Sequence, residues 1–247
     1  MLANRQTLTR LSWALVVLVI ISAATTLLLT SGVLHTQFDL PDLVDRLVAI
    51  RTDDEHMYPL VIIGSLAALG VYLVAAMLGL VIRAWAAPGA ARDIMTLLLV
   101  FGGLIGIAAQ LANIGVGDAA RPFYCDCGYR VEQMIGRDEA LNVGWSMVNW
   151  LQMGAVTFVG IGAAVAGSII HVSRAWRVIS YAVAAGVLLA VAIRVTASLV
   201  FIEAFDPFQV SDVIVAITSG ILVPVWAVML ARGVSDPNVE PVTGPAV

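Results

Sequence analysis

The stretch ISYAVAAGVLLAVAIRVTASLVFI, residues Ile179–Ile202, decides the fold because it is almost wholly apolar and contains a single charged residue, Arg194. A helix needs roughly 20 such residues to cross about 30 Å of hydrocarbon. Working outward from this run, five others have enough length: Leu11–Leu29, Leu60–Ile82, Ile94–Ala112, Val143–Ile170 and Val213–Ala231. Charged residues make up 12% of the 247 residues, against about 25% in soluble domains. The sequence therefore predicts an all-α, polytopic transmembrane bundle of six helices.

The arginines indicate how this bundle sits in its membrane. An even number of spans places both termini on one side, and seven arginines flank that side while five lie in the loops opposite. These two sets are Arg5, Arg10, Arg83, Arg92, Arg174, Arg177 and Arg232 against Arg46, Arg51, Arg121, Arg130 and Arg137. The excess of positive charge predicts that the N and C termini are cytoplasmic. We expect residues 1–233 to form the transmembrane domain and residues 234–247, which are rich in proline, to form a disordered cytoplasmic tail.

Two further features concern the ends of the spans. Residues Leu40–Ile50 follow Asp39, a good N-cap, and carry leucines and an isoleucine at helical spacing, which predicts a short amphipathic helix on the outer surface. Tryptophans gather near the inner ends of the spans and are typical of an interfacial aromatic belt. They are Trp13, Trp85, Trp176 and Trp226.

Several classes of membrane protein are excluded by residues that the chain lacks or places elsewhere. It has no lysine, so no retinal Schiff base can form. His35, His56 and His171 lie outside the apolar runs or at their ends, so paired axial ligands for an intramembrane haem are missing. No basic run points to nucleic acid. We therefore expect no cofactor and no nucleic-acid partner.

Polar residues within the predicted helices collect in their outer halves. On helix four they form one stripe at spacings of four, three and three residues, Asn142, Ser146, Asn149 and Gln152. On helix three a stripe of small and polar residues consists of Gly103, Gly106, Gln110, Asn113 and Gly117. If the two stripes face each other, they form a polar cleft open to the outside.

Arg194 is the strongest candidate for a functional residue. A guanidinium exposed to lipid costs about 3 kcal/mol on insertion scales, so it should face the bundle. Its expected partners are Gln110, Asn149 and Gln152, with Glu203 or Asp206 if the side chain extends outward. The predicted ligand-binding set is Arg194, Gln110, Asn113, Asn149 and Gln152, for a small anionic or carbonyl-bearing ligand, because the planar guanidinium binds such groups bidentately. The alternative is a structural arginine that bonds to neighbouring helices or extends to the outer interface.

Two outer segments carry reactive residue types without a complete site. Cys125 and Cys127 are separated by one residue and followed by Gly128, so they can close a small strained disulfide in an oxidising compartment. Free thiols, a redox pair, a bond to another chain and a partial metal site with His35 or His56 are the alternatives. The run Asp53–His56 contains three carboxylates and a histidine, but consecutive residues seldom point at one ion. We expect a solvated loop there and no metal site.

The chain resembles a known family in the organisation of its helices and turns. The shared features are the order of helices, the short inner turn Ala86–Arg92, the third helix beginning Arg92-Asp93-Ile94 and the long outer loop before helix four. The chain resembles a bacterial family of six-helix membrane proteins known as a domain of unknown function (DUF4386-like). The resemblance implies a six-helix fold over most of the chain and a bacterial inner-membrane location. It implies no catalytic residues.

These observations favour a protein without a catalytic set. The leading hypothesis is an accessory or interaction subunit or a small-ligand binder in the lipid bilayer, with a polar pocket open to the outer side. Its partners would be membrane-protein subunits or further copies of itself. A transporter or channel that uses the polar stripes around Arg194 is the alternative, although the inner halves of the helices offer few polar residues for a pathway. A membrane enzyme that uses the cysteine pair or the Asp53–His56 run is the second alternative.

Overall fold

The computed structural model describes residues 2–30, 43–120, 131–199 and 207–235, with side chains over 5–28, 59–119, 140–199 and 210–235. The described chain is helical, and six of its helical segments are long and apolar enough to cross a membrane. This confirms the all-α fold and the six predicted spans. The spans are Arg5–Leu28, Pro59–Trp85, Ala90–Ala119, Ala140–Ile169, Arg174–Leu199 and Val210–Ser235.

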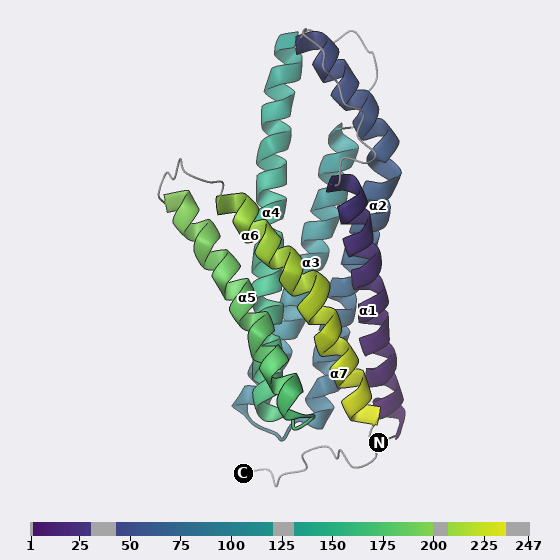
Figure 1. Cartoon of the computed structure of the whole chain (residues 1–247), viewed down its shortest axis with the longest axis vertical. Helices are drawn as coiled ribbons and strands as arrows, with labels where there is room; N and C mark the ends of the chain where they lie inside the picture. The colour runs from purple at the N-terminus through teal and green to yellow at the C-terminus, as the bar shows by residue number, and fades with distance from the viewer. Residues whose placement is uncertain (1, 31–42, 121–130, 200–206, 236–247) are drawn as a thin grey trace.

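Each span belongs to a longer run of helix (Figure 1). The first five spans correspond to α1 (Leu2–Thr30), α2 (Leu43–Ile82) with a short 3-10 turn η1 (Arg83–Trp85), α3 (Ala90–Ala120), α4 (Val131–Ile169) and α5 (Arg174–Leu199). The sixth combines α6 (Pro207–Ile217), the π-helical segment η3 (Thr218–Leu222) and α7 (Val223–Ser235). Helix α7 ends at Ser235, two residues beyond the predicted end of the transmembrane domain at residue 233, and Val234 is buried.

The prediction of a separate amphipathic helix over Leu40–Ile50 differs from the structure. Residues 43–50 are the first turns of α2, which continues through Pro59 to Ile82. Proline lacks the N–H that would bond to the preceding turn, so within a helix it produces a kink or an end. The upper part of α2 is accordingly inclined to the rest of the bundle in Figure 1.

The spans form a ring in which each packs on the next in sequence, and α7 closes the ring against α1. The two ends of the described chain therefore meet, and Thr9 Oγ1 lies 3.4 Å from Ser235 Oγ. We call the half of the bundle that contains these two residues the proximal half and the opposite half the distal half. The cytoplasmic location of the proximal end stays a prediction.

The proximal half is filled by large apolar side chains. Trp176 stacks on Trp226 with ring centroids 5.6 Å apart and an interplanar angle of 30°. The Trp226 Nε1–H donates to Ser180 Oγ at 2.9 Å, and the Ser180 hydroxyl donates to the Trp176 carbonyl at 2.9 Å. Other fully buried members of this core are Leu8, Leu78, Ile82, Met95, Leu230 and Val234. Between helices in lipid such close packing supplies much of the association energy.

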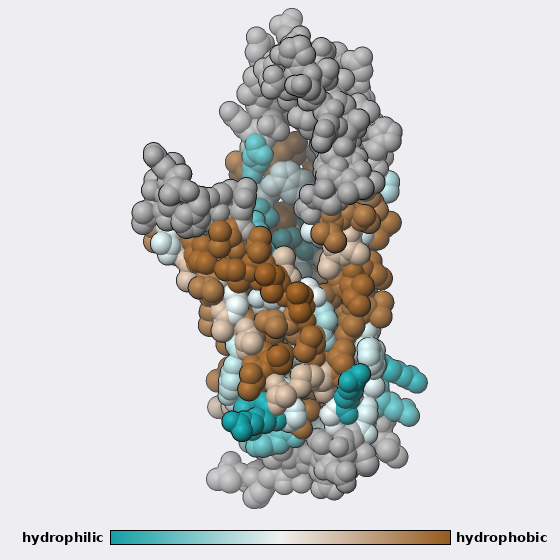
Figure 2. All heavy atoms as spheres, viewed as in Figure 1, coloured by the Kyte–Doolittle hydropathy of each residue, from teal (hydrophilic) through white to brown (hydrophobic). Residues whose placement is uncertain are grey.

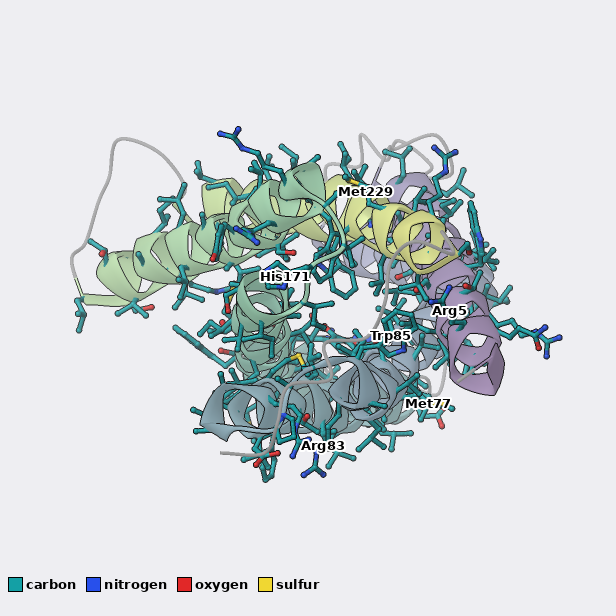
Figure 3. The ribbon with its side chains drawn as sticks, turned by 90° about the horizontal axis from the view of Figure 1, so that it is seen from below. Arg5, Met77, Arg83, Trp85, His171 and Met229 are labelled. Atoms are coloured by element: carbon teal, nitrogen blue, oxygen red, sulfur yellow. The ribbon has the colours of Figure 1, made fainter. Side chains whose placement is uncertain are left out.

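The predicted aromatic belt is therefore only partly correct. Trp13 is 45% exposed, but Trp85, Trp176 and Trp226 are buried in the core. At the proximal end seen in Figure 3, the guanidinium of Arg5 lies 5.5 Å from the centre of the Trp85 ring. Arg83 Nη2 forms an exposed ion pair with Asp93 Oδ1 at 3.0 Å. Charged groups thus collect around the rim of this end while the indoles point inward.

Candidate ligand pocket in the distal half

A pocket of about 580 Å³ occupies the distal half, and every one of the six spans contributes to its wall. In Figure 2 it is visible as a hollow with hydrophilic side chains at its back, between the apolar surfaces of α6 and α1. Its polar lining residues are Ser22, Thr25, Thr26, Ser65, Tyr72, Gln110, Asn113, Asn149, Gln152, Arg194, Asp212 and Ser219. A volume of this size is in the range of small-molecule sites.

Arg194 is held in the pocket wall by an ion pair and an aromatic ring. It is 8% exposed, and its Nη1 donates to Asp212 Oδ1 at 2.9 Å. The guanidinium carbon also lies 5.8 Å from the centre of the Trp150 ring. The pair joins α5 to α6, and the ring comes from α4. Removing a guanidinium from water is costly, and a carboxylate and an aromatic face compensate part of that cost.

Asp212 is the exposed partner of this pair. Its side chain is 60% exposed, whereas that of Arg194 is 9% exposed. Asp212 is also one of the residues that line the pocket. A ligand can therefore reach the carboxylate without first separating it from Arg194.

The amides of the pocket come from α3 and α4. Gln110 is 5% exposed, and Asn113 Nδ2 donates to Ser65 Oγ of α2 at 2.8 Å. Asn149 is an exposed residue and Gln152 is half-buried, and both line the pocket. The wall thus presents amide donors and acceptors at nearly the same depth as the ion pair.

The structure brings all five predicted ligand-binding residues, Arg194, Gln110, Asn113, Asn149 and Gln152, to one pocket. The other members of the helix-four stripe, Asn142 and Ser146, are exposed but do not line it. The ligand itself stays a prediction. Glu203 and Asp206, which were proposed as partners of Arg194, lie outside the described residues.

Two glycines of the helix-three stripe, Gly103 and Gly106, face α2. A Cβ on Gly103 would collide with Ala76 and with the Tyr72 carbonyl, and one on Gly106 would collide with the Tyr72 ring. These glycines allow α3 to approach α2 closely, so they do not contribute to a cleft against helix four. Small residues at helix interfaces in membranes commonly have this role. Only Gln110 and Asn113 of that stripe line the pocket.

Sequence reasoning missed Asp212 and Trp150. The predicted sixth span begins at Val213, one residue after Asp212, and Trp150 was not singled out. The sequence does contain a signal for Asp212. It lies at the start of the apolar run that follows the run with Arg194, and the two runs form neighbouring antiparallel helices. In an antiparallel pair of helices, residues near the end of one and the start of the next lie at the same depth.

The sixth span changes its helical geometry beside the pocket. Residues Thr218–Leu222 are π-helical, and Ser219 and Gly220 of this segment line the pocket. A Cβ on Gly186 of α5 would collide with Thr218, so α5 and the π-helical segment are in close contact. Single π-turns within α-helices occur often at functional sites because they redirect a few side chains. Here the turn directs part of the sixth span toward the pocket.

Several predictions fall on other parts of the chain. Cys125, Cys127 and His35 lie outside the described residues, so the predicted disulfide stays a prediction. Asp53–His56 form part of helix α2 rather than the expected loop, and their side chains are not described. Within the described part of the chain, no three His, Cys, Asp or Glu side chains come together in a group that can hold a metal.

Comparisons with models of protein families, with curated proteins and with solved structures found no match to this chain. The pocket therefore has to be interpreted from its own residues.

Proposed function

We propose that this multi-pass membrane protein, without acting as an enzyme, binds a small molecule whose polar group lies in the distal pocket. The observation that carries the proposal is the position of Arg194, which lines a pocket rather than a closed helix interface and has Asn149 and Gln152 in the same pocket. A purely structural arginine needs partners but no open volume beside it. In our proposal Arg194 and the amides contact a carboxylate, phosphate or carbonyl of the ligand.

The proposed setting is the bacterial inner membrane, with the proximal end cytoplasmic and the pocket in the outer half. The arginines at the proximal end support this orientation. A binding role also agrees with that of an accessory or interaction subunit, whose partners would be membrane proteins or further copies of this chain. Membership of the DUF4386-like family is part of the proposal and rests on the resemblance in helix order.

Transport is less well supported than binding. A transported ligand would have to pass the stacked, buried rings of Trp176 and Trp226 and the apolar side chains around them. That region offers few polar groups to replace a solvation shell. An enzyme would need its reactive groups in the cysteine segment or the Asp53–His56 run, and the pocket does not depend on either.

The test compares two asparagines of α4 that differ in position but not in chemistry. Asn149 lines the pocket, and Asn142 is exposed on the same helix outside it. The protein is purified in a mild detergent, and the small molecules that it carries are identified by native mass spectrometry and by extraction. We expect wild type and Asn142→Leu to carry the same small molecule and Asn149→Leu to lose it while still purifying as a folded protein.

A second measurement addresses access to the pocket directly. Asn149→Cys should react with a small water-soluble thiol reagent, and Val148→Cys, whose position is 2% exposed, should not. Wild-type protein gives the background from Cys125 and Cys127. Equal inertness of both introduced cysteines, together with identical small-molecule content in all variants, would contradict the proposed function.

A further inference from the structure

The pocket changes from polar to apolar with depth. Arg194 follows Arg174 by 20 residues, and Asp212 precedes Arg232 by 20 residues, so each lies about 30 Å along its helix from a proximal arginine. That distance is about the thickness of the hydrocarbon layer. The ion pair therefore lies at the level where the distal hydrocarbon meets the headgroups.

The floor of the pocket lies near the middle of the bilayer. Tyr72 precedes Arg83 by 11 residues and Val19 follows Arg10 by nine, which places them about 14 to 17 Å from the proximal arginines. Val71 and Val156 line the same lower part. From this floor to the ion pair, the pocket thus spans about one leaflet, with charge at the top and mainly aliphatic and aromatic groups below.

The pocket is also open toward the side of the bundle. In Figure 1, α6 diverges from α1 toward the distal end, and in Figure 2 the hollow lies between their apolar surfaces. Below the opening the two spans approach each other, since a Cβ on Gly220 would lie 4.0 Å from Ala23 Cβ. Above it α6 packs on α5 instead, where the Ser211 hydroxyl donates to the Ala190 carbonyl at 3.0 Å. A molecule in the distal leaflet can reach the pocket through this side.

The charges in the pocket balance. Arg194 and Asp212 are the only ionisable Arg, Asp, Glu, Lys or His side chains among the described lining residues, so the wall has one positive and one negative group. A ligand with net negative charge would gain from Arg194 but would meet the largely exposed Asp212 carboxylate. A ligand with both signs of charge satisfies both groups and leaves their ion pair intact.

From this juxtaposition of a balanced ion pair, an apolar floor and a lateral opening, we infer that the ligand is a zwitterionic phospholipid with an aminoalkyl phosphate headgroup. This inference rests on the proposed function and specifies its ligand. The phosphate contacts Arg194 and the amides of Asn149 and Gln152. The ammonium contacts Asp212, and one acyl chain extends down toward Tyr72 and Val19.

The experiment uses the full chain, released from detergent and measured by native mass spectrometry. The probes are dioleoyl phosphatidylethanolamine, dioleoyl phosphatidylglycerol and free phosphoethanolamine. Wild type should retain one phosphatidylethanolamine about tenfold more strongly than phosphatidylglycerol, the discrimination expected where like charges are brought together. Asp212→Asn removes the negative group and should abolish or reverse that preference. Asn142→Leu should leave it unchanged.

A second pair of variants tests the lateral opening and does not disturb the ion pair. Ala216 of α6 is exposed and lines the pocket, whereas its neighbour Ile217 is 50% exposed and does not line it. Ala216→Phe should lower lipid retention at least fivefold, and Ile217→Phe should leave it unchanged. These variants keep the proposal testable if Asp212→Asn does not fold.

The outcomes separate this inference from the proposed function. Equal retention of both lipids by wild type, or equal loss in Ala216→Phe and Ile217→Phe, overturns the lipid proposal. Saturable binding of free phosphoethanolamine without the lipid would show a headgroup site only and would also overturn it. In each of those cases the proposed function survives if Asn149→Leu still loses a small molecule that wild type carries.

Discussion

The two halves of this bundle are built from the same six helices but pack in opposite ways. In the proximal half large apolar side chains and two stacked indoles fill the interior. In the distal half the same helices enclose a pocket of about 580 Å³ and carry an ion pair and several amides. Lipid solvates apolar side chains as well as protein does, so close packing and polar contacts hold such a bundle together. The proximal half is held together mainly by close packing, and the distal half mainly by polar contacts.

Among substitutions that test this contrast, the largest loss of stability is expected at Trp176, which is completely buried. Trp176→Ala should lower the free energy of unfolding by about 3 kcal/mol, at the low end for a buried aromatic because the unfolded segment stays in lipid. Trp13→Ala, at a position 45% exposed, should change it little. Thermal unfolding in detergent measures both. Similar losses in the two variants would show that the proximal half is not stabilised by its packed core.

The next largest loss of stability is expected where α3 approaches α2 closely. Gly106→Ala places a methyl group against the Tyr72 ring and should destabilise the protein by about 2 kcal/mol. Gly115 on the same helix is the matched control, because nothing lies within 4 Å of a Cβ there. Gly115→Ala should be neutral or slightly stabilising, since alanine favours helix. If Gly106→Ala melted at the wild-type temperature, the two helices would not approach as closely as the structure has them.

The ion pair of the distal half should have a smaller effect on stability. Asp212→Asn leaves the Arg194 guanidinium without its carboxylate, but Asp212 is 60% exposed, so we expect a loss of about 1–2 kcal/mol rather than the value for a fully buried pair. A double-mutant cycle with Arg194→Gln measures the coupling. Strictly additive effects of the two substitutions would mean that the pair contributes nothing to the fold.

The smallest effect concerns the hydrogen bond beneath the stacked indoles. Trp226→Phe keeps most of the aromatic packing but removes the Nε1–H that donates to Ser180, and it should cost about 1 kcal/mol. Ser180→Ala in the Trp226→Phe background should add less than it does in wild type, because their shared bond is already absent. Full additivity would contradict a shared contribution of this bond. Together these four experiments compare the packed half with the polar half.

Much of the fold could be predicted from the sequence, but less of the site. Six apolar runs can satisfy their backbone groups in lipid only as helices, so the spans follow from composition and length. The depth of Asn149, Gln152 and Arg194 also follows, because depth is position along a helix. Which way a side chain points around the helix does not follow. The sequence therefore did not show that Gly103 and Gly106 face α2, and Trp176 and Trp226 were placed in an interfacial belt although they are buried.

By itself, the sequence determined that this chain spans a membrane six times and that its polar side chains lie near one end of the spans. Both properties depend on local composition, because the transfer of each helix into the bilayer depends on the residues of that helix alone. Only the tertiary structure decided that Arg194 pairs with Asp212, that α1 and α6 separate toward the distal end, and that the polar residues of several helices surround one pocket. These features depend on how the helices are rotated and tilted against each other, which is set by packing between residues far apart in the chain.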